Sequence, residues 1–304
     1  MKNYKVLSFL LLANLFWAGN YVFGKYVVAE MPPLQLTFSR WLFAIFLLFP
    51  IAHVVEKPNW KQVWKEWKIL LIMSLLGIVG YNFLLYEALK YTSSMNAALV
   101  NSINPAVIVL FASLFLKERI SIMNGFGLII SLFGVLLVLT KGQIQQLFLI
   151  HYNIGDLLML AAILVWTFYS ILGKKMKKIP PIASTAVSAL FSVLMLLPFI
   201  LTFGVHLPPS RESALGLLYI AIFPSVFSFI FWNASVREIG PSRAGIFLNL
   251  ITVFTAILSV LLGNSITFTQ ILGGILVFLG VYFTSQKKNP AKLKQLRKGI
   301  LGSK

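Results

Sequence analysis

The chain has 304 residues, of which 59% are hydrophobic and 11% are charged, and its formal net charge is +18. Soluble domains average about 45–50% apolar and about 25% charged residues. This composition, with a mean hydropathy of +0.87, therefore excludes a soluble globular domain. The 26 phenylalanines, 7 tryptophans and 10 tyrosines exclude a disordered chain, and the lack of cysteine excludes disulfides and thiolate metal sites. The sequence predicts an all-α integral membrane protein.

Long apolar intervals, uncharged except where 41–55 extends back through Arg40 to Pro33, predict ten transmembrane helices, because one crossing needs about 20 largely apolar residues. Eight intervals each suit one crossing: 6–24, 33–55, 69–86, 91–116, 120–140, 157–173, 179–210 and 213–236. The interval 244–286 is too long for a single crossing, and the turn formers around Gly263 divide it into two helices.

The positive charges predict the orientation of these spans, since cytoplasmic loops of membrane proteins are rich in Lys and Arg. With the N-terminus inside, only Lys25, Lys90, Lys141 and Arg211 fall in outside segments, and Arg40 lies within a span. All the other cations fall inside. We therefore expect a multi-pass protein of the cell membrane with both termini in the cytoplasm.

The two halves of the chain resemble each other. The segment from Trp17 to Lys25 is echoed by the segment from Trp166 to Lys174, with a tryptophan, a glycine and a lysine at the same spacing. Further echoes pair Tyr86-Glu87-Ala88 with Trp232-Asn233-Ala234, Ile120-Ser121 with Ile266-Thr267, Gly127 with Gly273, and Gly134 with Gly280. Each half has an odd number of spans, so the sequence predicts two inverted five-helix repeats, which are typical of alternating-access transporters.

This repeat divides the chain into four expected parts. Residues 1–140 form the first five-helix repeat, 141–153 an external linker, 154–286 the second repeat and 287–304 a basic cytoplasmic tail. The tail combines cations with leucines and isoleucines at helical spacing, so we expect it to lie on the anionic inner leaflet of the lipid bilayer. We expect no nucleic acid partner.

Several motifs carry a resemblance to a known family. They are the Trp-x6-Gly-Lys segment that opens each half, Tyr86-Glu-Ala-Leu-Lys-Tyr-Thr followed by Asn96-Ala-Ala-Leu, Asn104-Pro105, and Leu116-Lys-Glu118-Arg-Ile-Ser. Together they resemble the EamA family of the drug/metabolite transporter (DMT) superfamily over nearly the whole chain.

The resemblance implies an inner-membrane permease, often an exporter of amino acids or other small metabolites. It also implies a central cavity lined by spans 1, 3, 4, 6, 8 and 9, with spans 5 and 10 packed together at the periphery. Two departures make the second half the more diverged copy. Asn264 replaces Glu118, and only Thr252 or Val253 stands near the counterpart of Pro105.

Polar and aromatic side chains within the spans are the candidate substrate-binding residues, because polar groups in lipid are costly and need a reason. They are Asn20, Asn82, Asn101, Asn104 and Asn249, together with Trp17, Tyr81, Trp166 and Tyr169. The amides suit a zwitterionic or polar solute, and the rings suit an apolar or cationic one. The alternatives are hydrogen bonds between helices, worth about 0.6 kcal/mol per pair, and ordinary aromatic packing.

Charges and prolines within the spans form a second candidate group. Glu87 is the acid inside a span, and we expect it to pair with Arg40 or Lys25 as a gating charge pair at the outer surface. A proton-coupling role for Glu87 is the alternative. Pro105 and Pro224 lie in mid-span, where they predict helix breaks that either line the cavity or act as simple kinks. The glycines seven residues apart in spans 5 and 10 predict close packing between these two helices.

The sequence thus predicts a secondary transporter, and not an enzyme, that exports a small metabolite by alternating access. Asp156 is the only aspartate, and His53, His151 and His206 lie apart, so we expect no metal site and no cofactor. A membrane-embedded enzyme and a channel-like pore are the competing hypotheses. The expected partners are a small-molecule substrate, the lipid bilayer and, as an option, a second copy of the chain in a homodimer.

Overall fold

The computed structural model describes residues 2–118, 121–143, 145, 153–176, 178–204, 207–263 and 265–285. All regular elements in this part of the chain are helical. The expected tail, Asn264 and most of the expected linker lie outside the described residues. The first half contains α1 (Lys2–Glu30), α2 (Pro33–Ile51), η1 (Ala52–Glu56), α3 (Trp60–Lys65), α4 (Trp67–Met73), η2 (Ser74–Gly80), α5 (Tyr81–Tyr91), α6 (Ser94–Asn101), α7 (Asn104–Leu116) and α8 (Ile122–Thr140).

The second half follows a similar order, without counterparts of η1 and α3 and with an added 3-10 segment. It contains α9 (Ile154–Lys175), α10 (Pro181–Phe203), α11 (Arg211–Ile222), η4 (Phe223–Ser228), α12 (Phe229–Ile239), α13 (Pro241–Gly245), η5 (Ile246–Asn249), α14 (Leu250–Leu261) and α15 (Phe268–Ser285).

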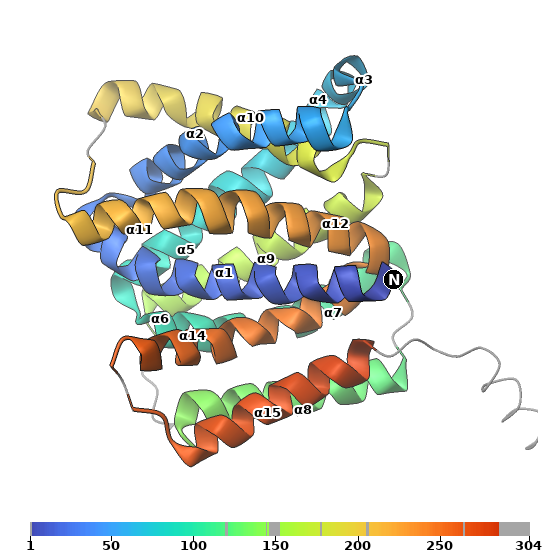
Figure 1. The fold of residues 1–304 in the computed structure, drawn as a ribbon, viewed down its shortest axis with the longest axis vertical. Coiled ribbons are helices and arrows are strands. Elements are labelled where there is room, and N and C mark those ends of the chain that lie inside the picture. Colours follow the sequence, from blue (N-terminus) through green and yellow to red (C-terminus); the bar gives the residue numbers. More distant parts are fainter. Residues whose placement is uncertain are drawn as a thin grey trace, which may run out of the picture.

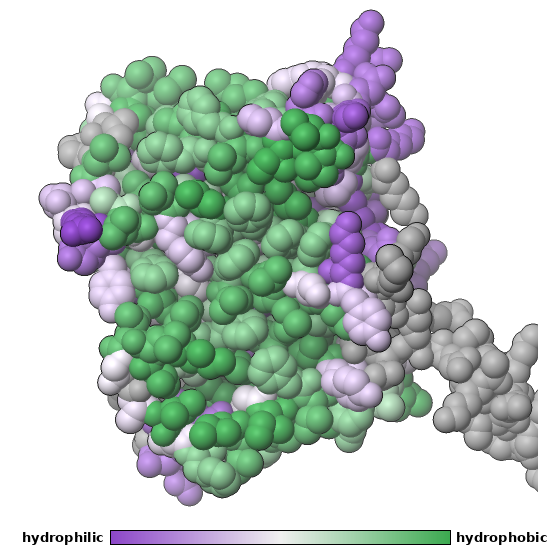
Figure 2. Space-filling model, viewed as in Figure 1, coloured by the Kyte–Doolittle hydropathy of each residue, from purple (hydrophilic) through white to green (hydrophobic). Residues whose placement is uncertain are grey.

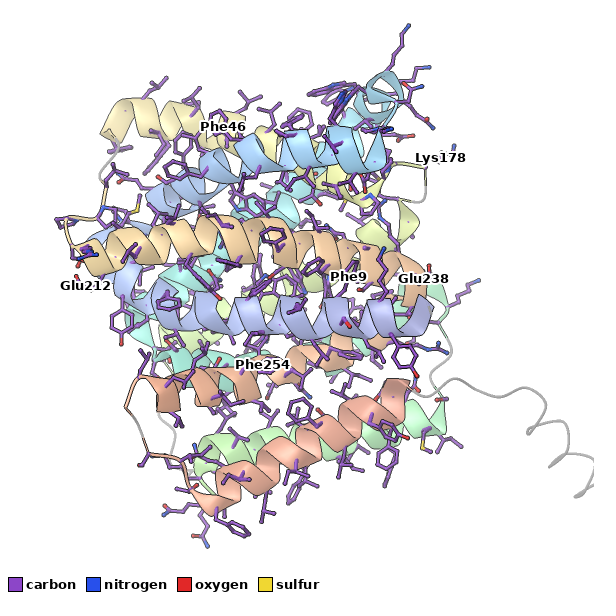
Figure 3. All side chains as sticks on the ribbon, viewed as in Figure 1. Phe9, Phe46, Lys178, Glu212, Glu238 and Phe254 are labelled. Atoms are coloured by element: carbon purple, nitrogen blue, oxygen red, sulfur yellow. The ribbon has the colours of Figure 1, made fainter. Side chains whose placement is uncertain are left out.

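Among the described residues, nine helices are long and apolar enough to cross a membrane, and a shorter apolar helix spans Phe268–Thr284. The shorter helix runs beside α8, which is itself one of the nine (Figure 1). The all-helical membrane fold is confirmed, and nine candidate crossings with this tenth apolar helix come close to the predicted ten. An apolar band covers the visible face, with hydrophilic side chains gathered at its two ends (Figure 2). Lys178 and Glu238 lie at the end that holds the N-terminus, and Glu212 lies at the opposite end (Figure 3).

The two halves are interlaced and do not merely sit side by side. In the first half, α1 packs against α11, α12 and α14 of the second half. In the second half, α9 packs in the equivalent way against α5, α6 and α7 of the first half. Each half therefore packs its opening helix against the other half, and α1 and α9 both lie midway along the bundle in this view (Figure 1).

Matching spans of the two halves share breaks in their helical backbone. Span 3 contains the π-helical segment η2, and span 8 contains the π-helical segment η4 at the equivalent place. Span 4 is interrupted by a turn at Ser102 and Ile103, and span 9 by the 3-10 segment η5. Pro224 and Pro105 lie at two of these breaks, while η2 and η5 contain no proline. The backbone breaks therefore occur in matching spans of the two halves, whereas the prolines do not.

The helices α8 and α15 form a close pair at the edge of the bundle (Figure 1). A Cβ atom added at Gly127 would lie 2.5 Å from the carbonyl oxygen of Gly280, and one at Gly134 would lie 2.6 Å from that of Gly273. The two backbones therefore touch where the sequence placed the four glycines. The predicted packing of spans 5 and 10 is confirmed.

Candidate functional site

Arg40 lies at the centre of a buried polar network between the two halves. Its side chain is fully buried, about 10 Å into α2 when counted at 1.5 Å per residue from Pro33. The Nε atom donates to Ser225 Oγ at 2.7 Å, across the boundary between the halves. The Nη1 atom donates to Asn82 Oδ1 at 2.7 Å and also contacts Asn20 Oδ1 at 3.4 Å.

Tyr86 completes this network. Its hydroxyl oxygen accepts from Arg40 Nη1, and its hydroxyl group donates to Asn20 Oδ1 at 2.7 Å. The predicted candidates Asn20, Asn82 and Arg40 are thus brought together, with Tyr86 and Ser225 added. A buried charge is costly unless hydrogen bonds surround it, and here four neutral oxygens from three helical spans do so.

The two π-helical segments hold the neutral partners of Arg40 in place. Asn82 follows η2 and donates its Nδ2 hydrogen to Ile78 O at 2.6 Å, which turns its Oδ1 atom toward Arg40. Ser225 lies within η4 and donates to Ile220 O at 2.8 Å, so its oxygen is free to accept from the guanidinium. The backbone breaks therefore help to build the network.

The structure corrects the expected outer charge pair. Glu87 contacts Lys90 at 3.0 Å on the exposed side of α5, and it pairs with neither Arg40 nor Lys25. Successive residues of a helix point about 100° apart. Tyr86 is fully buried, so its neighbour Glu87 faces away from the centre.

The lysines of the repeated Trp-x6-Gly-Lys segment share a different role. Lys25 Nζ donates to the carbonyl oxygens of Leu89 and Thr92 at the end of α5, at 2.5 and 2.8 Å. Lys174 Nζ donates in the same way to Arg237 O, near the end of α12, at 2.8 Å. Cations suit the carbonyl ends of helices, so both lysines tie the first helix of a half to the third.

An aromatic cluster fills the space beside the arginine network. The ring centroid of Trp166 lies 5.2 Å from that of Trp17, 5.5 Å from that of Trp232 and 4.9 Å from that of Tyr81. Phe229 contacts this group, with its centroid 5.6 Å from that of Trp166. These residues come from both halves, so the rings form the contact surface between the halves.

A second polar network lies in the second half, at repeat-related positions. Asn233 Nδ2 donates to Tyr169 OH at 2.7 Å and to Thr185 Oγ1 at 3.0 Å. Tyr169 occupies the position in α9 that Asn20 occupies in α1, and Asn233 follows Trp232 as Glu87 follows Tyr86. This second network contains no charged side chain.

The other candidate asparagines lie in separate contacts. Asn104 Nδ2 donates to Asn101 Oδ1 at 3.1 Å across the break between α6 and α7. Asn249 Nδ2 donates to Ser131 Oγ of α8 at 2.8 Å, which is a contact between helices. Asn104 Oδ1 and Asn249 Oδ1 are buried and have no hydrogen-bond partner.

Sequence reasoning did not select Tyr86, Ser225, Phe229, Trp232 or Asn233 as site residues. A signal was present for most of them, because Tyr86 and Trp232 begin the matching motifs of the two halves and Ser225 follows Pro224. Phe229 lies among many phenylalanines of similar apolar surroundings, so its position in the sequence carries no such signal.

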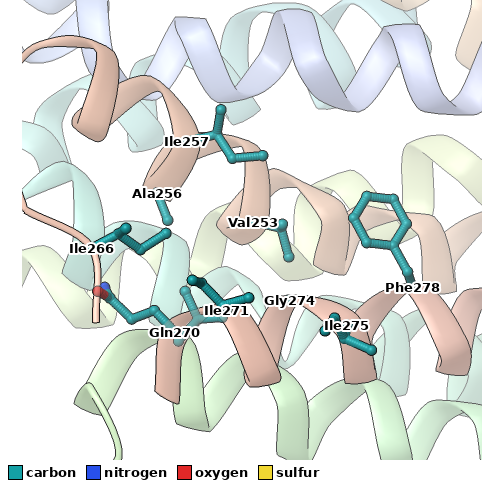
Figure 4. Close-up of a pocket in the computed structure, with 10 residues that line it drawn as sticks. Val253, Ala256, Ile257, Ile266, Gln270, Ile271, Gly274, Ile275 and Phe278 are labelled. Carbon is teal, nitrogen blue, oxygen red and sulfur yellow. The ribbon is translucent and has the colours of Figure 1, made fainter. Parts of the chain in front are cut away.

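The centre of the protein is closed in this structure. Arg40 is fully buried, and Asn20 and Trp166 are each only 2% exposed. Two described pockets lie elsewhere. One, of about 220 Å³, is apolar and lies between α14 and α15 near Gln270 (Figure 4). The other, of about 260 Å³, lies at the ends of α1 and α12 beside Lys5 and Glu238. Within the described ranges, no group of three His, Asp or Glu side chains is placed to hold a metal ion.

Comparison with known proteins agrees with this arrangement. The chain matches the EamA-like transporter family over residues 5–140 and 153–286. The chain belongs to this family. The protein named Uncharacterized transporter YyaM of Bacillus subtilis (strain 168) is 28% identical over 291 residues, which cover 94% of this chain and 95% of that protein.

Two further comparisons cover nearly the whole chain. A protein of Archaeoglobus fulgidus named Uncharacterized transporter is 30% identical over 292 residues, which cover 94% of this chain and 99% of that protein. A solved crystal structure, 20% identical in sequence, superimposes with a TM-score of 0.75 and covers 92% of this chain and 98% of that one. The structural likeness supports the fold, and the family and its relatives support a multi-pass membrane transporter.

Proposed function

We propose that this EamA-like protein is a secondary transporter that exports a small metabolite, such as an amino acid or a related polar or amphipathic compound, by alternating access. We place it in the cell membrane with both termini in the cytoplasm. The observation that carries the proposal is the closed centre, where Arg40 of the first half binds Ser225 of the second half beside aromatic rings from both.

The packing supports a rocking mechanism. Each opening helix packs against the other half, so the halves can exchange equivalent conformations around a fixed midplane site. The Arg40–Ser225 hydrogen bond and the contacts among the tryptophans join side chains, which can separate without disturbing any helix. Backbone breaks beside the centre, at η2, η4 and η5, give these spans places to bend.

The competing functions find less support at the centre. A membrane-embedded enzyme needs a positioned acid, base or nucleophile, whereas the described central groups are one arginine with amides, hydroxyls and indoles. A channel-like pore needs a ring of equivalent groups around a conduction path. The central side chains here pack directly against one another.

A screen of cells that overproduce the protein tests the proposal. We expect resistance to at least one toxic metabolite or metabolite analogue, followed by saturable flux of that compound in vesicles without ATP. Counterflow is the deciding measurement, because a carrier exchanges substrate across the membrane and a pore does not. Flux should be lost in Trp166→Ala and kept in Gly125→Ala, since a Cβ at Gly125 meets nothing within 4 Å. Flux that neither saturates nor shows counterflow would support the channel instead.

A further inference from the structure

Several buried hydrogen-bond donors near the centre have no partner. Arg40 Nη2 and the indole nitrogens of Trp41, Trp166 and Trp232 are all buried without a hydrogen-bond partner. Guanidinium and indole nitrogens can only donate, so no rotation of these groups turns them into acceptors. A buried donor without a partner is energetically costly. A ligand rich in acceptor atoms is the chemistry that would satisfy them.

These donors belong to one continuous cluster. The guanidinium carbon of Arg40 lies 5.5 Å from the centre of the Trp41 ring, which in turn lies 4.8 Å from the Phe229 centroid. Phe229 contacts Trp166, and Trp166 contacts Trp232. Arg40 Nη2, the unpaired nitrogen of the cation, therefore lies at the edge of the aromatic cluster.

The charge of the site points to an anion with a single negative charge. Every hydrogen-bond partner of Arg40 is neutral, and its positive charge has no described carboxylate to balance it. One monoanion would neutralise the site. A phosphate dianion would leave a second unpaired charge buried in the membrane, which is costly. A carboxylate also accepts two parallel hydrogen bonds from a guanidinium.

The same network offers little to an ammonium group. Asn20 Oδ1 already accepts from Tyr86 and Arg40, and Asn82 Oδ1 already accepts from Arg40. This inference rests on the transport function proposed above and narrows its range of small metabolites. We propose that the substrate is a monocarboxylate with a flat apolar body and no ammonium group, and therefore not an amino acid. Arg40 binds the carboxylate, the aromatic cluster stacks on the body, and the unpaired indole N–H groups of that cluster offer further hydrogen bonds to the ligand.

Four ligands of one shape test this proposal on the purified full-length protein in detergent. Phenylacetate carries the anion, phenylacetamide is neutral, 2-phenylethylamine is cationic and phenylalanine carries both charges. We expect phenylacetate alone to raise the melting temperature, by about 1–2 °C at a few times its Kd. An equal or larger rise with the amine or with phenylalanine would overturn the proposal. So would the absence of a rise with phenylacetate, benzoate and indole-3-acetate alike.

Variants test whether the rise in melting temperature with phenylacetate depends on Arg40 and Trp166. Arg40→Gln should abolish the rise, and Arg211→Gln, at an exposed position of α11, should keep it. If Arg40→Gln does not fold, Trp166→Phe serves instead, because it keeps the ring and removes one donor, and it should weaken phenylacetate binding several-fold. A rise that survives either central change at full size would contradict the site.

Counterflow in liposomes separates this inference from the transport function on which it rests. Binding of phenylacetate without any flux would leave the carboxylate site standing and count against transport. Counterflow of the neutral, cationic or zwitterionic compound in place of the carboxylate would support transport and overturn the substrate class.

Discussion

The α8–α15 pair and the central network are two contact regions of one molecule, built in opposite ways. Along α8 and α15, glycines bring backbone against backbone, and an added Cβ would collide with a carbonyl oxygen. At the centre, side chains meet side chains, and several buried donors lack a partner. The first region suits a permanent contact, and the second suits a contact that opens and closes.

The energetics follow from this difference. A close backbone contact loses its packing along the whole helix pair if the helices separate. A hydrogen bond such as Arg40–Ser225 can be exchanged for one to a substrate, because the same donor atom serves both partners. The unsatisfied donors make the closed centre less favourable than it would be if fully paired. We therefore expect mutations at the edge to affect folding and mutations at the centre to affect transport.

The largest effect is expected for Gly134→Leu in α8. The new side chain would meet the Gly273 backbone at 2.6 Å and force the two helices apart. Overpacking typically costs about 1–3 kcal/mol, and more where backbone must move. Folded yield and melting temperature in detergent measure this loss. Gly125→Leu in the same helix is the matched control, and an equal loss in both variants would contradict the close contact.

A smaller effect on stability, with a large effect on flux, is expected for Asn20→Leu. The change leaves the Tyr86 hydroxyl and Arg40 Nη1 with fewer acceptors, which should cost about 1–2 kcal/mol. Melting curves beside a flux assay check both parts. Thr284→Val, which removes a buried hydrogen bond to Gly280 O in α15, should keep the flux. Normal flux in Asn20→Leu would place the site elsewhere.

The smallest effect is expected for Glu87→Gln. Its partner Lys90 is 42% exposed, and exposed ion pairs contribute about 0–1 kcal/mol. The double variant with Arg40→Gln should be additive in melting temperature, since the two residues do not touch. A non-additive change in melting temperature would indicate that Glu87 and Arg40 do interact, which would contradict the structure.

The sequence allowed much of the fold to be predicted, because the governing patterns are local. Apolar intervals marked the spans, and glycines seven residues apart marked the α8–α15 contact. The segment η2 escaped prediction, since it contains glycines but no proline to announce a break.

The sequence identified individual residues of the candidate site, but it did not show which of them contact one another. Asn20, Asn82 and Arg40 stand out as polar groups inside apolar runs. Their grouping depends on how the helices turn and on how the halves interlace. Arg40 and Ser225 are 185 positions apart, and no local pattern joins them. Tyr86 contacts Arg40 in place of the expected Glu87, because Tyr86 lies on the face of α5 that turns inward.

Alternating opening of the centre is the central claim, and spin-label distances in liposomes test it most directly. Cysteines introduced at Lys90 and Glu212 report on the end proposed to face outside, and those at Lys61 and Arg243 on the end proposed to face the cytoplasm. All four are exposed positions of a chain without native cysteine. A third pair at Phe126 and Tyr282 reports on α8 and α15. With a compound found by the resistance screen, we predict that one end opens as the other closes while the third distance stays constant. Both ends opening together, or neither moving while flux continues, would contradict the account.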